Sequence, residues 1–150
     1  MMNMRTLFLA LCVLCLCLLA WGCGGGGGGA DTTPPVISYV SLSPSTFTFE
    51  GGATTVTAVV TDNATEPASL EVNAYLMDPI SLEIIVGPAP LSLQSGNTYQ
   101  GILFVYPNLT SEDRVYLVRV SATDAAQNTA NNDSQQVTVP GLQQPPPQPT

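Results

Sequence analysis

Residues 114–123 decide the fold, and they read Arg-Val-Tyr-Leu-Val-Arg-Val-Ser-Ala-Thr. From position 116 onward every second side chain is apolar, and most of those between them are polar. Because successive side chains of a strand point to opposite faces, this period of two residues predicts a β-strand with one buried face. The predicted inner set is Tyr116, Val118, Val120 and Ala122, and the outer set is Arg119, Ser121 and Thr123.

The same period recurs in residues 54–61 and 69–77, with no 3.6-residue period anywhere in the region. β-Branched residues are common, and Gly, Pro, Asn and Asp separate the short runs, which is typical of a sandwich. We therefore predict an all-β sandwich of about seven to eight antiparallel strands. The predicted strands are 36–42, 54–61, 69–77, 82–86, 91–94, 98–106, 114–123 and 134–139. Residues 98–106 are apolar on both faces, so their inner side stays open.

The N-terminus has a different pattern: Arg5, an apolar run over 7–21, then Gly22, Cys23 and glycines at 24–29. It resembles a bacterial lipoprotein signal peptide, in which a small residue precedes a cysteine that is acylated and becomes the new N-terminus. The apolar run is shorter than the ~20 residues that span a bilayer and fits the apolar region of a secretory signal. The resemblance implies that Cys23 carries lipid and anchors the protein in a cell envelope. Gly24 after the cysteine, in place of Asp, favours the outer over the inner membrane in an organism with both.

Two alternatives remain for this segment, a plain secretory signal and an uncleaved anchor. On the lipoprotein interpretation, the chain divides into a signal peptide (1–22), a glycine-rich tether (23–33), the sandwich (34–140) and a Pro/Gln-rich tail (141–150). Glycine-rich chains are flexible coils, whereas the proline-rich tail is expected to be disordered and polyproline-like. A run such as Pro-Pro-Pro-Gln-Pro also serves as a ligand for aromatic grooves.

Charge limits the partners. Cleavage before Cys23 removes one of the three basic residues and none of the 11 acidic ones, so the net charge falls from −8 to −9. No basic patch remains to displace counterions from phosphates, which argues against nucleic acid as a partner. Attraction to anionic lipid headgroups is disfavoured for the same reason, so membrane affinity must come from the lipid. No cysteine remains for a disulfide, because Cys23 itself would be acylated.

Two segments carry a family resemblance. Residues 31–37, Asp-Thr-Thr-Pro-Pro-Val-Ile, and 121–130, Ser-Ala-Thr-Asp-Ala-Ala-Gln-Asn-Thr-Ala, resemble the start and end of bacterial immunoglobulin-like and hyalin-type repeats. Residues 43–46 and 51–57 resemble their first hairpin. The resemblance implies an immunoglobulin-like sandwich over 34–140, with Tyr116 suited to a tyrosine corner. Gln127 stands where the closing motif usually has Gly, so a positive φ needed there would pass to Asn128.

The resemblance also places a group of oxygen-bearing side chains at one end of the sandwich. The loops after the second and seventh strands share that end in an immunoglobulin fold, and the first strand begins there. Ca²⁺ takes 6–8 oxygen ligands, which carboxylates and amides from separate loops supply. Ordinary turn capping by Asp and Asn explains the same residues without a metal. The candidate Ca²⁺ ligands are Asp31, Asp62, Asn63, Asp124 and Asn128.

No catalytic set is evident. After Cys23 the chain has no His, no Lys and no further Cys, which removes the usual nucleophiles and bases. We therefore expect a non-enzymatic protein: an envelope lipoprotein whose single immunoglobulin-like domain acts as a binding, adhesion or spacer module. Its partners would be the membrane, through Cys23, and a protein or polysaccharide ligand. The main alternative is an accessory structural subunit of a larger envelope assembly, and a remote one is a carboxylate-based hydrolase.

Overall fold

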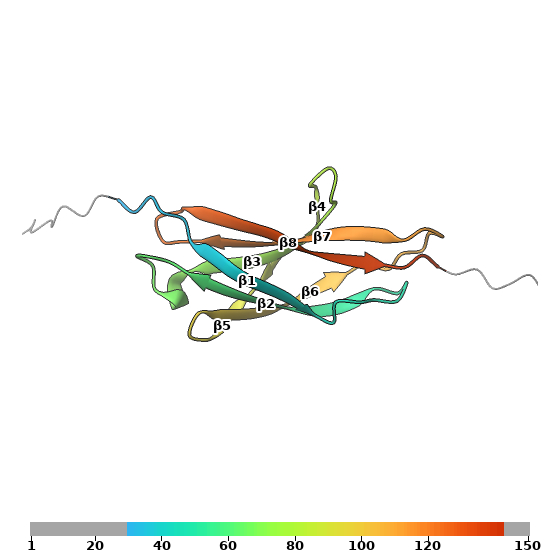
Figure 1. Ribbon diagram of the computed structural model, residues 1–150, viewed down its shortest axis with the longest axis horizontal. Coiled ribbons are helices and arrows are strands. Elements are labelled where there is room, and N and C mark those ends of the chain that lie inside the picture. The colour runs from blue at the N-terminus through green and yellow to red at the C-terminus, as the bar shows by residue number, and fades with distance from the viewer. Residues whose placement is uncertain (1–29, 143–150) are drawn as a thin grey trace, which may run out of the picture. The chain divides into compact units, whose positions relative to one another are not determined.

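A computed structural model describes residues 30–142. The signal peptide, Cys23 and most of the tether fall outside these residues, as do residues 143–150 of the tail. Eight strands account for most of the described chain (Figure 1). They are β1 (Val36–Ser43), β2 (Gly52–Thr61), β3 (Glu71–Met77), β4 (Ile84–Pro90), β5 (Ser92–Ser95), β6 (Thr98–Val105), β7 (Arg114–Thr123) and β8 (Thr129–Val139).

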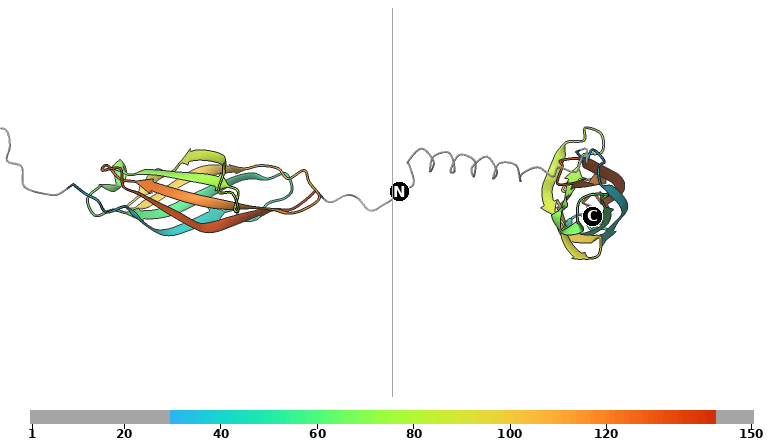
Figure 2. Two further views of the ribbon diagram at one scale, coloured as in Figure 1. Left: turned by 90° about the horizontal axis from the view of Figure 1, so that it is seen from above. Right: turned by 90° about the vertical axis from the view of Figure 1, so that its left-hand side faces the viewer.

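The strands form two antiparallel sheets that face each other, as the end-on view of Figure 2 shows. The first sheet has the order β1-β2-β6-β5 and the second the order β4-β3-β7-β8. This confirms the predicted immunoglobulin-like β-sandwich, with β4 as an additional strand beside the three that form the smaller sheet of a seven-strand domain. A short 3₁₀ helix, η2 (Pro67–Ser69), links the two sheets between β2 and β3.

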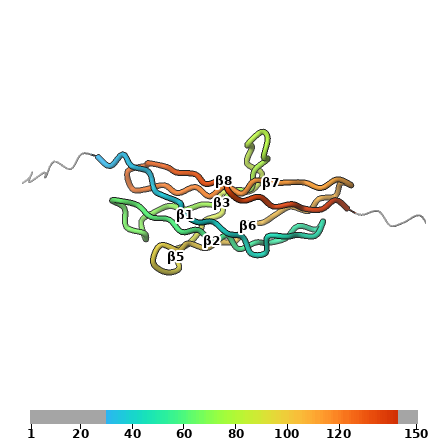
Figure 3. Tube along the Cα trace, in the orientation of Figure 1, coloured from blue at the N-terminus to red at the C-terminus, as the bar shows by residue number. Residues whose placement is uncertain are grey.

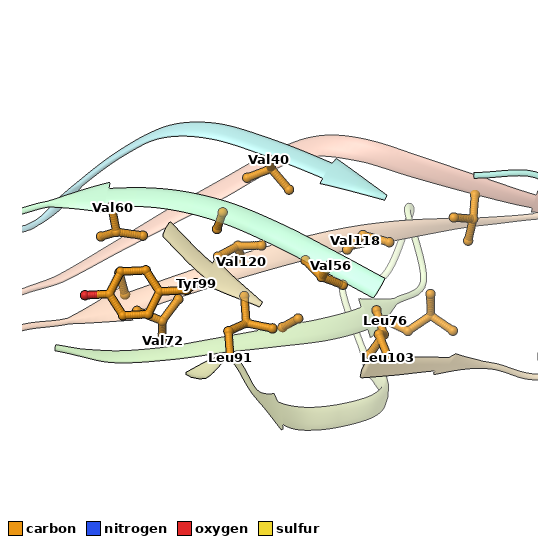
Figure 4. Close-up of a cluster of buried hydrophobic side chains, with 14 of the residues drawn as sticks. Val40, Val56, Val60, Val72, Leu76, Leu91, Tyr99, Leu103, Val118 and Val120 are labelled. Atoms are coloured by element: carbon orange, nitrogen blue, oxygen red, sulfur yellow. The ribbon is translucent and has the colours of Figure 1, made fainter. Parts of the chain in front are cut away.

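The core lies between the sheets, because every strand except the fully exposed β5 turns apolar residues inward (Figure 4). The period of two predicts the inner faces correctly in all three runs, and every apolar member is buried: Val56, Ala58 and Val60 in β2, Leu70, Val72, Ala74 and Leu76 in and just before β3, and Tyr116, Val118, Val120 and Ala122 in β7. Burial of such β-branched and leucine side chains contributes about 1.5–3 kcal/mol each relative to exposure. The fully buried large side chains of the core include Val56, Val60, Leu76, Tyr99, Leu103, Val118, Val120, Val137 and Val139.

The inner side of β6, which the sequence left open, is now assigned. Tyr99, Leu103 and Val105 are buried, whereas Ile102 and Phe104 are 51% and 62% exposed. Gly101 occupies the remaining inward position, where a Cβ atom would lie 2.7 Å from Leu91 Cδ2. The glycine therefore leaves room for the chain to cross from β4 to β5 and to bury Leu91.

Several sequence predictions differ from the structure, among them the bounds of β4, which spans Ile84–Pro90 and not residues 82–86. Strand β8 begins at Thr129 and not at residue 134, because its polar first half pairs with β7, from Thr129 opposite Thr123 onward. Gln127 itself adopts the left-handed conformation, with φ of 71°, so the positive φ does not pass to Asn128. Tyr116, the residue expected to form a tyrosine corner, is buried. Among the described residues, however, the tyrosine whose hydroxyl bonds a loop is Tyr99, which donates to the Pro67 carbonyl.

The two ends of the sandwich differ in what they carry. At the N-terminal end, β1 begins with Val36 opposite Thr61, the last residue of β2. At the C-terminal end, β8 finishes with Val139 opposite Arg114, the first residue of β7. The Cα trace in Figure 3 shows that the described chain enters at one end and leaves at the other. The start of β1 and the end of β8 are therefore separated by the length of the sandwich.

Edge strands have their own features. β4 carries Pro88 and Pro90, and proline is tolerated in a sheet mainly at an edge because it lacks an N–H donor. β5 is only four residues long. β1 has an irregular register between Ile37 and Tyr39, and the outer strand β8 is largely polar over residues 131–136.

Candidate functional site

Two loops and the segment before β1 meet at the N-terminal end of the sandwich. Asp62 directly follows β2, and Asp124 directly follows β7. The amide of Ala125 donates to Thr65 Oγ1 at 3.3 Å, which ties the two loops together. The side chain of Tyr99 reaches the same region from the core and bonds the Pro67 carbonyl at the start of η2. Strand ends and these cross-links therefore fix both carboxylates.

Asp62 shapes its own loop. Its Oδ2 accepts hydrogen bonds from the amides of Ala64 and Thr65, both at 2.8 Å. This is the turn-capping geometry that Asp favours at the end of a strand. The other oxygen, Oδ1, is buried and accepts no hydrogen bond from any described residue. Turn capping thus explains the position of Oδ2 but not the burial of Oδ1.

Asp124 is 2% exposed and closes the β7–β8 turn. Its Oδ1 accepts from the Asn128 amide at 2.7 Å, and its Oδ2 accepts from Asn128 Nδ2 at 2.8 Å. Burial acts to raise the pKa of this carboxyl, but hydrogen bonds from Asn128 and from the amides of Ala126 and Gln127 outweigh it and lower the pKa. Asp124 is therefore held in the ionised form despite its burial.

The predicted site residues come together in part. Asp31, Asp62 and Asp124 each offer a carboxylate oxygen, and these oxygens all lie within 4.8 Å of one another. Asn128 caps Asp124 through its amide nitrogen. Asn63 is exposed and lines a pocket of about 230 Å³ together with Asp62 and Asn97. Three carboxylates from separate segments at this spacing form a negative centre whose donor atoms are all hard oxygens, the type that Ca²⁺ prefers.

Some residues that build this site were missed by the sequence analysis. Thr65 connects the two loops, and Tyr99 anchors η2, yet neither belongs to a motif. Thr65 sits three residues after Asp62, at a position that the Asp62 side chain caps, and this spacing was the available signal. The sequence had no signal for Tyr99, because residues 98–106 are apolar on both faces.

The predicted lipidation residue, Cys23, lies outside the described residues. Within residues 30–142, no helix has the length and apolar character needed to cross a membrane. Neither statement bears on the acidic site, which belongs to the loops of the sandwich.

No family model and no curated protein sequence matches this chain. Among solved structures, it is similar to the crystal structure of a DUF4785 family protein from Legionella pneumophila, with 14% sequence identity and a TM-score of 0.46. The similarity covers 74% of this chain and 29% of that protein. This chain thus spans less than a third of the length of that structural neighbour.

Proposed function

We propose that this protein is a lipid-anchored component of a bacterial envelope whose single immunoglobulin-like sandwich serves as a binding or spacer module. The observation that carries the proposal is the placement of the two chain ends: β1 begins at the N-terminal end of the sandwich and β8 finishes at the C-terminal end. A ten-residue strand such as β2 spans about 33 Å at ~3.3 Å per residue. A module of this kind holds whatever follows β8 about one sandwich length away from the point where β1 begins.

A catalytic role finds less support in the acidic site. A carboxylate-based hydrolase needs one carboxyl group whose pKa is raised so that it can act as a general acid. The hydrogen bonds around Asp124 lower its pKa instead. One oxygen of Asp62 already accepts hydrogen bonds within its own turn. The geometry of both groups favours a structural task.

We further propose that a divalent cation, Ca²⁺, binds Asp31, Asp62 and Asp124. It would thereby connect the segment before β1 to the loop after β2 and the loop after β7. Two observations support it: the 4.8 Å grouping of carboxylate oxygens, and the buried Asp62 Oδ1 that accepts no hydrogen bond. A cation there would offset three negative charges in close proximity.

Fractionation of cells tests the anchor. Cys23→Ser should move the protein from the membrane fraction to the soluble fraction and abolish labelling by radioactive palmitate. Cys17→Ser is the matched control, because Cys17 follows Leu16 and not a small residue. Retained labelling in the Cys23 variant would contradict the anchor. Cross-linking in intact cells then separates a binding module, which captures an external protein or polysaccharide, from an accessory subunit with a fixed envelope partner.

Thermal unfolding tests the cation. A ligand that binds only the folded state stabilises it by about 2.7 kcal/mol at a hundredfold excess over its Kd. Residues 30–150 should therefore unfold at a higher temperature in millimolar Ca²⁺ than in chelator. Asp62→Asn should lose this shift, because it removes the negative charge that binds the cation. It should still fold, because the remaining side-chain oxygen can accept the hydrogen bonds of the turn. Glu112→Gln, at the opposite end, should keep it. Equal melting temperatures of the unaltered protein in Ca²⁺ and chelator would leave turn capping as the whole explanation.

A further inference from the structure

A groove of about 540 Å³ lies on the C-terminal half of the sandwich, between the β3–β4 hairpin and the start of β7. The hairpin stands out from the body of the sandwich in Figure 3, and its residues Asp78, Pro79 and Ile80 line the groove. Ile80, near the hairpin tip, is 93% exposed, and Val115 of β7, which also lines the groove, is 43% exposed. Pro79, Ile85 and Tyr116 complete the apolar lining. Apolar side chains gathered around a groove mark a binding surface more often than single exposed ones do.

The floor of the groove is an open strand edge. β7 pairs with β8 from Arg114 onward, but its pairing with β3 begins only at Leu117, opposite Met77. Residues 114–116 therefore have no neighbouring strand on the β3 side. The N–H and C=O groups of successive residues in a strand point to alternate edges, so at least one of these three presents its backbone groups to the groove.

Hydrogen bonds hold the turn of the β3–β4 hairpin together. Asp78 Oδ1 accepts hydrogen bonds from the amides of Ile80 and Ser81, at 2.9 and 2.7 Å. The Asp78 amide donates to the Glu83 carbonyl at 2.9 Å, which closes the turn. A wall that is ordered before binding reduces the entropy cost of receiving a ligand.

The chain leaves the sandwich beside this groove. The Gly141 amide donates to Asp113 Oδ1 at 2.9 Å, and Asp113 is one of the residues that line the groove. The Leu142 amide donates to the Thr110 carbonyl at 2.7 Å. A Cβ on Gly141 would lie 2.8 Å from the Glu112 amide nitrogen, so close packing also fixes this exit. The next residues of the sequence are Gln-Gln-Pro-Pro-Pro-Gln-Pro-Thr, 143–150.

We propose that residues 143–150 of this chain dock in the groove beside β7 and cover its apolar lining. The length is sufficient, because eight residues in polyproline geometry span about 25 Å, whereas residues 113–116 extend over about 10 Å. The chemistry is complementary. Proline rings pack against Ile80, Val115 and Tyr116, and proline carbonyls accept from the open N–H groups of the β7 edge. Glutamine amides in the same segment donate to the carbonyls of that edge.

Nuclear magnetic resonance on residues 30–150 tests the docking, since this length contains both sheets and the whole core. Comparison with a protein that stops at Leu142 should show amide shift changes confined to residues 78–85 and 113–116. A spin label on Gln148→Cys should strongly broaden the same amides in the longer protein. Broadening should not depend on protein concentration, because the segment and the groove belong to one molecule.

Three variants sharpen this test. Val115→Lys places a charge in the groove and should abolish the shift changes and the broadening. Ile102→Lys changes a similarly exposed residue on the other sheet and should leave both unchanged. Replacement of Pro145, Pro146 and Pro147 by glycine should also release the segment, because the preformed extended conformation is lost. Broadening that grows with concentration would assign the groove to a second copy and overturn the proposal, as would shifts that are identical with and without residues 143–150.

Discussion

Substitutions on the two faces of β6 are expected to change stability by very different amounts. Leu103 is fully buried between the sheets, whereas its neighbour Ile102 is 51% exposed on the outer face. Leu103→Ala removes a buried isobutyl group and leaves a cavity, which in well-packed cores costs about 2–5 kcal/mol. For a domain of about 100 residues each kcal/mol lowers the melting temperature by about 4–8 °C. We therefore expect Leu103→Ala to lower the melting temperature by at least about 8 °C.

Ile102→Ala is the matched control, one position along the same strand. Half of its side chain is already in contact with water, so its removal should cost no more than about 1 kcal/mol in lost burial and strand propensity. Urea unfolding followed by circular dichroism measures both free energies, and unchanged m-values would show that the unfolded states are comparable. A larger effect at Ile102 than at Leu103 would mean that β6 is shifted by one residue, which exchanges its two faces, and would refute the assignment.

Three further outcomes follow from the structure. Tyr99→Phe removes the hydrogen bond to the Pro67 carbonyl and should lower the free energy of unfolding by about 1 kcal/mol in the same urea assay; no change would mean that this bond contributes nothing net. Gly87→Ala should cost more, because φ is 124° and the new Cβ would lie 2.8 Å from Tyr75 Cδ1, whereas Gly96→Ala, with open space around it, should reveal the backbone cost alone. Acid should destabilise the fold, since carboxyls with a lowered pKa contribute stability above the pKa of the unfolded chain and lose it as pH falls through the folded one; urea midpoints at pH 7 and pH 3 that coincide would contradict this. The carboxyls concerned are Asp78, Asp124 and Asp133.

Much of the fold was predictable because the buried faces follow a strict period of two. In β2, β3 and β7 the apolar positions are Val, Leu, Ala or Tyr and the intervening ones are mostly polar, so burial alone sets the register. In β6 that contrast is missing, and packing against the opposite sheet decides which residues face inward. The start of β8 was missed because Ala130, Asn131 and Asn132 have no apolar period, and their strand conformation comes from pairing with β7. Tertiary contacts override local preference at such positions.

The candidate site was predictable to a similar degree. The resemblance to immunoglobulin-like domains implied that the loops after β2 and β7 share one end with the start of β1, and the carboxylates of Asp31, Asp62 and Asp124 do lie near one another. The sequence could not show how each carboxylate spends its hydrogen bonds. Only the structure shows that both oxygens of Asp124 are capped by Asn128, while Asp62 Oδ1 accepts none. This difference makes Asp62, and not Asp124, the more informative position for the substitution that tests cation binding.

The four sheet edges bear on how copies of the protein would behave if lipid anchored them to one membrane, as proposed above. Lipid-anchored molecules are concentrated in two dimensions, where exposed strand edges can pair between neighbours and begin fibrillar assemblies. Here each edge resists such pairing by a different means: two prolines on β4, a length of four residues in β5, an irregular register in β1 and a largely polar stretch in β8. If the protein is lipid-anchored as proposed, these features disfavour edge-to-edge pairing of β1, β4, β5 and β8 between crowded neighbours.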